Sequence, residues 1–289
     1  MRLPDFLIIG AAKSGTTTLY RYLCHHSQIY MSPHKEPSFF ARDEVYARGI
    51  EWYAALFDEA NPEQICGEAS TDYTKFPRWP HSAERIAQWL PQVKMIYIMR
   101  NPVDRAYSYY VHINRGLKVD ETFEEHLEKT SICLDGSRYL LQIKRYLQFF
   151  PQESFLFLLL EDLTEQPNQT LSAVCQFLGI AQDFDFNDQG TITANSGKNW
   201  FEQKMRVQLT APIKAIPGAE ATAALLPRQW RDWVYHHLIS GSFYGKQIKQ
   251  QYINPPMLPE TRQRLIAHYR PLNQQLSEFL NRDLSLWNQ

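Results

Sequence analysis

The sequence lacks long apolar runs, internal repeats and paired cysteines, and each absence excludes a class of protein. No apolar stretch in the 289 residues approaches the ~20 residues of a membrane span, so no membrane-spanning helix is expected. The four cysteines are widely spaced and form no Cys-x-x-Cys pair. No second pair of ligands accompanies Cys24-His25-His26, so we expect no metal site. Without repeats, low-complexity stretches or a Gly/Ser-rich linker, the chain is predicted to form a single domain over residues 1–289.

A surplus of charge of one sign is also missing. The formal net charge is −1, from 30 Lys and Arg against 31 Asp and Glu, which gives no bulk attraction to nucleic acid or to an anionic membrane. We find no signal peptide before the first apolar segment, which predicts a cytoplasmic protein if Met1 is the natural start. Cys24 and Cys175 lie in apolar helical patterns and are predicted to be buried free thiols.

Short apolar runs alternate with segments of helical periodicity along the first two thirds of the chain. We predict strands at Phe6–Ile9, Ile65–Cys66, Met95–Met99 and Phe155–Leu160. Helices are predicted at Thr16–His25, Gly49–Phe57, His81–Leu90, Val103–Asn114, Phe123–Lys129, Ser137–Phe149, Asn168–Leu178, Arg228–Ile239 and Pro259–Arg282. This alternation indicates an α/β fold with three layers, in which helices flank a central parallel sheet and the C-terminal third is helical.

The segment Phe6–Tyr20 combines a predicted strand, a small-residue loop and a helix start. The strand breaks at Gly10, and the loop carries one lysine before the helix begins. Backbone N–H groups at a helix N-terminus attract an anion, and the lysine adds a full positive charge. A Walker A loop would place its lysine after the second glycine, whereas here the lysine precedes it. The predicted anion-binding residues are Lys13, Ser14, Gly15, Thr16 and Thr17.

A second candidate for nucleotide binding follows the predicted strand Met95–Met99. Arg100 comes at the end of the strand, Asn101-Pro102 opens a helix, and Ser108 lies within that helix. An ATPase or kinase would be expected to place an acidic magnesium ligand at such a strand end. A guanidinium group instead forks onto a phosphate, which favours a nucleotide with an additional phosphate and no bound metal.

These two motifs together resemble the cofactor site of sulfotransferases that use 3′-phosphoadenosine 5′-phosphosulfate (PAPS). The resemblance implies a P-loop-like fold in which Lys13 and its loop bind the 5′-phosphosulfate. It also implies that Arg100 and Ser108 bind the 3′-phosphate, with 3′-phosphoadenosine 5′-phosphate (PAP) as the product. Asn195-Ser196-Gly197-Lys198 resembles the late basic loop of the family, which implies a contact of Lys198 with the cofactor.

The segment Pro33–Phe40 resembles the Lys-Glu-Pro-x-Phe-Phe stretch of the carbohydrate-modifying, heparan-sulfate-type branch. The resemblance implies that Glu36 is the general base and that Lys13 stabilises charge on the leaving phosphate oxygen. The branch carries a lysine where this chain has Ala69, which leaves Glu68, Ser70 and Tyr73 as candidate acceptor contacts. The expected acceptor is a hydroxyl of a carbohydrate, of a lipid or of a hydroxyacyl chain on a carrier protein.

Two other classes stay open at this point. A P-loop kinase would bind Mg-ATP, although Arg100 stands where its acidic ligand is expected. A non-catalytic nucleotide-binding scaffold would keep the fold and would tolerate the loss of Glu36.

Overall fold

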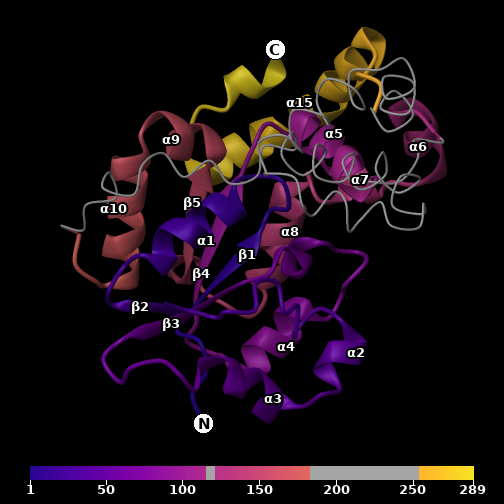
Figure 1. The fold of residues 1–289 in the computed structure, drawn as a ribbon. Helices are drawn as coiled ribbons and strands as arrows, with labels where there is room; N and C mark the ends of the chain where they lie inside the picture. Colours follow the sequence, from indigo (N-terminus) through magenta and orange to yellow (C-terminus); the bar gives the residue numbers. More distant parts are fainter. Residues whose placement is uncertain (115–120, 183–253) are drawn as a thin grey trace, which may run out of the picture. The chain divides into compact units, whose positions relative to one another are not determined.

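The computed structural model describes residues 1–114, 121–182 and 254–289. Within these ranges the core is a parallel sheet of five strands in the order β2-β3-β1-β4-β5 (Figure 1). The strands are β1 (Phe6–Gly10), β2 (Ile29–Met31), β3 (Ile65–Ala69), β4 (Lys94–Met99) and β5 (Phe155–Leu159). The parallel α/β prediction is therefore confirmed.

Most of the helices fall where the apolar periodicity predicts them. The α-helices are α1 (Thr16–Cys24), α2 (Asp43–Tyr46), α3 (Ile50–Ala54), α4 (Ser82–Trp89), α5 (Pro102–Ile113), α6 (Phe123–Lys129), α7 (Ile132–Asp135), α8 (Tyr139–Tyr146), α9 (Leu160–Glu165), α10 (Pro167–Leu178) and α15 (Pro259–Leu280). Short 3-10 turns are η1 (Ala55–Phe57), η2 (Thr71–Thr74), η3 (Gln152–Ser154) and η6 (Ser285–Asn288). No helix in the described ranges has both the length and the apolar character that a membrane crossing requires.

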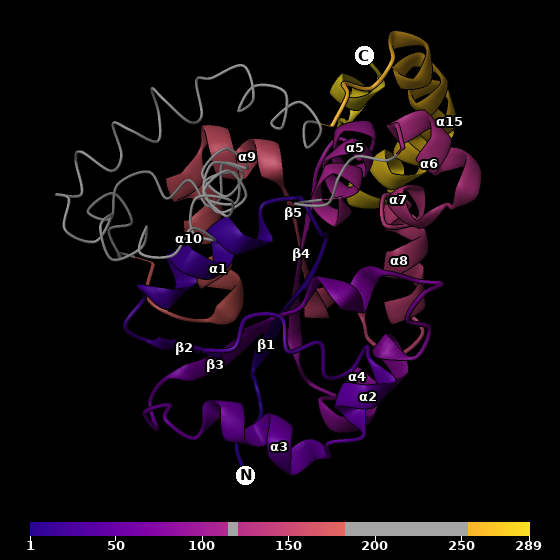
Figure 2. The same cartoon turned by 45° about the vertical axis from the view of Figure 1, so that its right-hand side comes forward.

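The three layers follow from the alternation of side chains along each strand. Phe6 and Ile8 of β1 face a cluster that includes residues of α1, α9 and α10. Leu7 and Ile9 face the opposite cluster, which includes residues of α3, α4, α8 and α15. Figures 1 and 2 show α1, α9 and α10 together on one side of the sheet and α3, α4 and α8 on the other. Both faces are covered, which explains why the central strands read as continuous apolar runs.

The chain divides into two compact units. The first comprises Met1–Tyr109, Leu127–Ala194 and Leu258–Gln289 and contains the whole sheet. The second comprises Tyr110–His126 and Asn195–Met257. In its described part, the Tyr110 hydroxyl donates to the Glu121 carbonyl at 2.6 Å and the Tyr110 ring lies 5.3 Å from that of Phe123. A single domain over residues 1–289 stays a prediction.

Several sequence predictions need correction: the strand predicted at Ile65–Cys66 continues to Ala69, and Leu160 begins α9 instead of ending β5. β2 was not predicted, because its three residues are too few to show the alternation of apolar and polar side chains that marks a strand. The predicted helix Ser137–Phe149 is longer than the observed α8, because residues 137–138 lie before the first turn of α8 and residues 147–149 lie after its end. Cys24 is exposed, because the buried face of α1 consists of Thr16, Leu19, Tyr22 and Leu23; Cys175 is buried as predicted. The predicted helix Arg228–Ile239 and the loop at Lys198 lie outside the described residues.

Candidate active site

The loop between β1 and α1 presents a helix N-terminus at the carboxyl edge of the sheet. Lys13 has φ 71° and Gly15 has φ 95°, so both residues adopt the left-handed backbone conformation just before α1 begins. A Cβ at Gly15 would lie 2.7 Å from Leu160 Cδ1 and would force that side chain to move, and the φ angle of this residue favours glycine. The Ala11 N–H donates to the Ile98 carbonyl at 2.7 Å and ties the loop to β4.

No side chain caps the first turn of α1, and no acidic residue lies in it. Its N–H groups, together with the half-buried Lys13, therefore form an electropositive site that suits a phosphate or sulfate group. Of the other predicted loop residues, Ser14 and Thr16 are buried and Thr17 is half-buried.

Arg100 lies directly beside this loop. Its Nη1 donates to the Lys13 carbonyl at 3.4 Å, because β4 is the neighbour of β1 and both strands end at the same edge. The Tyr139 hydroxyl donates to the Arg100 carbonyl at 2.7 Å and fixes the backbone of this residue. The structure thus joins the two motifs that are 87 residues apart in the sequence.

The helix that follows Arg100 begins as predicted. The Asn101 side chain accepts the N–H groups of Val103 and Asp104 at 3.0 and 3.3 Å, and thereby caps α5. Ser108 lies in this helix and is half-buried.

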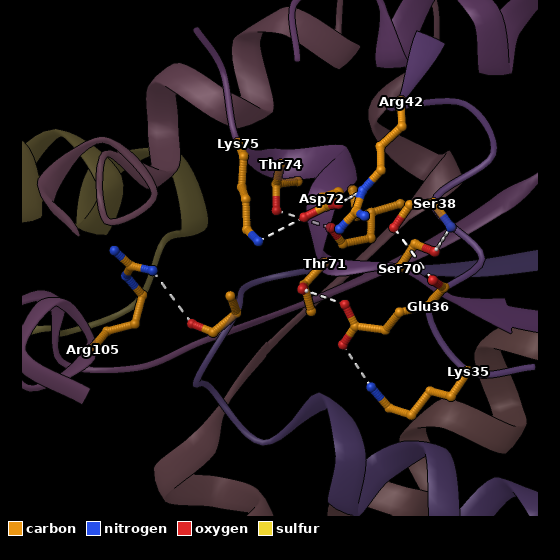
Figure 3. A network of polar contacts seen from close by, with 12 residues as sticks. Lys35, Glu36, Ser38, Arg42, Ser70, Thr71, Asp72, Thr74, Lys75 and Arg105 are labelled. Atoms are coloured by element: carbon orange, nitrogen blue, oxygen red, sulfur yellow. Dashed lines mark hydrogen bonds and ion pairs between the residues drawn. The ribbon is translucent and has the colours of Figure 1, made fainter. Parts of the chain in front are cut away.

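Glu36 lies on a tightly held loop next to the end of β3 (Figure 3). Glu36 and Ser38 have positive φ angles of 60° and 55°, which non-glycine residues adopt only where their surroundings impose them. The Glu36 N–H donates to the Ala69 carbonyl at 3.0 Å, and the Ser38 N–H donates to Ser70 Oγ at 2.9 Å. These bonds to the end of β3 fix the backbone on both sides of the Glu36 side chain.

The carboxylate of Glu36 is held at both oxygens. Oε1 accepts a hydrogen bond from Lys35 Nζ at 2.7 Å, and Oε2 accepts one from Thr71 Oγ1 at 2.9 Å. The side chain stays 37% exposed. Glu36 is therefore a fixed carboxylate that a ligand can reach from solvent, and Thr71 is a partner that sequence reasoning missed.

Glu68, Ser70 and Tyr73 are all buried, and Glu68 lies inside β3 rather than after it. Tyr73 and Tyr53 donate to Glu68 Oε2 at 2.7 and 2.9 Å. Burial raises the pKa of Glu68 to about 7, against the hydrogen bonds that favour its charged form. Contact of these three residues with an acceptor stays a prediction.

A buried carboxylate near the same edge was not among the predicted residues. Asp72 is 3% exposed and binds Arg42 Nε at 2.6 Å and Lys75 Nζ at 2.7 Å, as Figure 3 shows. Burial alone would raise the pKa of Asp72, but Lys75 and Arg42 lower it below its usual range. Lys75 is close enough in sequence to be suspected, whereas Arg42 joins only through the fold.

Arg105 of α5 was also missed. It is 1% exposed, and its guanidinium donates to the Ala12 carbonyl at 3.4 Å, to Ser137 Oγ at 2.5 Å and to the Cys133 carbonyl. This buried cation therefore supports the loop from the side of α5. Among the described residues, no three His, Cys, Asp or Glu side chains gather in a way that could hold a metal ion.

Comparison with known proteins gives consistent results over most of the chain. The model of the sulfotransferase domain family matches residues 3–223. The human bifunctional heparan sulfate N-deacetylase/N-sulfotransferase 3 is 28% identical over 308 residues, which cover 97% of this chain and 30% of that protein. The chain thus spans about a third of the length of this relative.

Two solved structures resemble the fold. A sulfotransferase from Alicyclobacillus acidocaldarius is 27% identical with a TM-score of 0.69, and the match covers 100% of both chains. A sulfotransferase domain from the curacin biosynthetic pathway is 19% identical with a TM-score of 0.50, covers 68% of this chain and 80% of its own, and shows the fold alone. With a family model matched over more than two thirds of its length, the chain belongs to the sulfotransferase family.

Proposed function

We propose that this protein transfers the sulfuryl group of PAPS to a hydroxyl group of an acceptor and releases PAP. The observation that carries the proposal is the hydrogen bond from Arg100 Nη1 to the Lys13 carbonyl, which brings the two nucleotide motifs together. Arg100 also stands at a strand end where a Mg-ATP kinase would be expected to place an acid.

The residues present fit this cofactor. The uncapped, acid-free first turn of α1 and Lys13 suit a 5′-phosphosulfate. Arg100 is expected to fork onto the 3′-phosphate, and we assign Ser108 and Lys198 to the same group. The cofactor supplies the activated sulfuryl group. Lys13 is expected to neutralise the charge that develops on the leaving phosphate oxygen.

Glu36 is the proposed general base. An alcohol is a poor nucleophile until a positioned group begins to remove its proton. Lys35 and Thr71 each use one lone pair of the Glu36 carboxylate. Each carboxylate oxygen has a second lone pair, which can take the proton from the hydroxyl group of the acceptor molecule. The same two bonds fix the direction of the carboxylate, so little reorganisation is needed before proton transfer.

The acceptor class is also a proposal. The human relative named above is called a heparan sulfate N-sulfotransferase, and an N-sulfotransferase transfers to nitrogen. This chain could serve a carbohydrate, a lipid or a carrier-bound hydroxyacyl chain, and an amine is the second candidate nucleophile. Pairs of sugars that differ only in carrying a hydroxyl or an amine at one carbon distinguish these two nucleophiles.

The test is PAPS-dependent sulfation of such an acceptor panel by the wild type and by Glu36→Gln. Gln keeps the shape of the side chain but cannot take a proton, so we expect turnover to fall by roughly 10²–10⁴-fold while PAP binding is retained. The charge-matched control is Glu63→Gln, at an exposed position before β3. Full turnover in Glu36→Gln would remove Glu36 from the mechanism. PAP binding without transfer to any acceptor, in the wild type as well, would favour the non-catalytic scaffold.

A further inference from the structure

A pocket lined by basic side chains lies beside the candidate active site. Its volume is about 290 Å³, at the small end of the range for small-molecule sites. We call it the basic pocket and define it by Lys75, Arg78, Arg105 and Tyr109; its lining also includes Thr130, Ser131 and Asp135.

Two of its cations are held in place by the protein. The Lys75 side chain is 18% exposed, and its ammonium lies 2.7 Å from Asp72 Oδ1 and 5.1 Å from the centre of the Tyr109 ring. The guanidinium of the buried Arg105 lies 5.5 Å from the centre of the same ring. The Tyr109 ring thus contacts two cations, so the positive charge of Lys75 and Arg105 is fixed rather than carried on mobile side chains.

The third cation is available to a ligand. Arg78 is exposed, and its guanidinium lies 5.3 Å from the Trp79 ring. In the described part of the chain, no carboxylate lies within ion-pair distance of it. Asp135, the carboxylate of the lining, accepts a hydrogen bond from Ser131 Oγ at 2.7 Å and lies 4.0 Å from Arg138. With Asp72 behind Lys75, three cations face two carboxylates, and the pocket keeps a surplus of positive charge.

The pocket adjoins both halves of the proposed reaction site. Lys75 directly follows η2, whose first residue Thr71 binds Glu36. Arg105 binds the carbonyl of Ala12, the residue before Lys13. The groups assigned to the nucleotide, Lys13, Arg100 and Ser108, do not line the pocket. Its positive charge is therefore left over after the cofactor has been accounted for.

We propose that the basic pocket binds a compact anionic group, a carboxylate or a sulfate, that the acceptor carries near its reacting hydroxyl. The inference rests on the proposed sulfotransferase function and specifies its acceptor: a molecule with a negative charge beside the hydroxyl, selected by Lys75 and Arg78. Charge-assisted bonds to a guanidinium and an ammonium supply this selection. The volume suits one such group with its immediate attachment, not a long polyanion.

The test measures calorimetric binding of three probes to the protein saturated with PAP, which occupies the nucleotide groups. The probes are methyl glucuronide, which carries hydroxyls and a carboxylate, the neutral methyl glucoside, and inorganic sulfate. We expect the glucuronide to bind at least fivefold more tightly than the glucoside. Arg78→Gln should weaken the glucuronide at least fivefold, and Arg78→Lys should retain most of the affinity. Arg78 is exposed, so neither substitution threatens the fold.

The matched control is Arg21→Gln, which removes an exposed arginine from α1, and it should leave all three affinities unchanged. Equal binding of the glucuronide and the glucoside, or an unchanged glucuronide affinity in Arg78→Gln, would overturn the proposal. Sulfate binding that depends on Arg78, without glucuronide binding, would assign the pocket to a free anion and also overturn it. Failure of PAP to bind would instead refute the proposed function. The two failures can be told apart, because the probes can also be titrated against the protein without PAP.

Discussion

The buried carboxyl of Glu68 predicts an unusual dependence of stability on pH. Glu68 lies in β3 with 0% exposure, and burial raises its pKa from 4.5 to about 7. Between these two values the folded protein holds a proton that the unfolded chain has already lost. The free energy of unfolding therefore falls as the pH rises through this window. The difference in pKa corresponds to about 3 kcal/mol, fully expressed above pH 7 and absent below pH 4.5.

Replacement of Glu68 by Gln isolates this contribution. The Gln carbonyl can still accept the hydroxyls of Tyr53 and Tyr73, but the side chain no longer ionises. We expect the stability of Glu68→Gln relative to wild type to increase by up to about 3 kcal/mol between pH 5 and pH 8. Other titrating groups are shared by both proteins and cancel in this difference.

The assay is urea denaturation at pH 5, 6, 7 and 8, with Glu63→Gln as the control at an exposed position. The control should follow the wild type at every pH. A constant difference between Glu68→Gln and wild type over the whole range would refute the reasoning, because it would mean that Glu68 does not change its protonation between pH 5 and pH 8 in the folded protein.

Two other predictions concern hydrogen bonds of individual side chains. Asn101→Ala removes the cap of α5 and should cost about 1 kcal/mol of stability in urea denaturation, whereas Asn101→Asp keeps an acceptor and should cost less; equal losses would show that the cap does not matter. Thr71→Val removes the donor to Glu36 Oε2 and should lower kcat roughly tenfold with PAP affinity unchanged, while Thr71→Ser restores it. A loss confined to PAP affinity would contradict this positioning role.

Features with a local cause could be predicted from the sequence. The left-handed conformation of Gly15 follows from the glycine in a loop between an apolar strand and a helical period. The start of α5 follows from Asn101-Pro102, because asparagine caps a helix and proline suits its first turn. The carboxyl ends of parallel strands lie at one edge of the sheet, so the proximity of Arg100 to the β1 loop could also be predicted.

Features that depend on tertiary pairing could not be predicted. β2 forms because Ile29 and Met31 pair with Ile65 and Gly67 of β3. A segment of three residues is too short for its sequence to predict such a strand. β3 continues through Glu68 because two tyrosine hydroxyls donate to Oε2 of its carboxyl group inside the core. A glutamate in sequence reads as the end of a strand when its partners are unknown.

The basic side chains near the site show the same limit. Arg42 reaches Asp72 across 30 positions, and Arg105 reaches Ala12 across 93. Neither spacing carries a signal by itself. The positive charge beside the site was hidden in a chain whose net charge is −1, because composition averages over surfaces that the fold separates.

We propose that the β1 loop and Arg100 together bind a nucleotide with a 3′-phosphate. The most direct measurement is a calorimetric comparison of PAP with AMP, which lacks only that phosphate, on the wild type and on Arg100→Ala without added metal. We expect the wild type to prefer PAP, and we expect Arg100→Ala to lose roughly 10–100-fold in PAP affinity while its AMP affinity is unchanged. Equal affinities for PAP and AMP in the wild type, or an equal loss of both in Arg100→Ala, would contradict it.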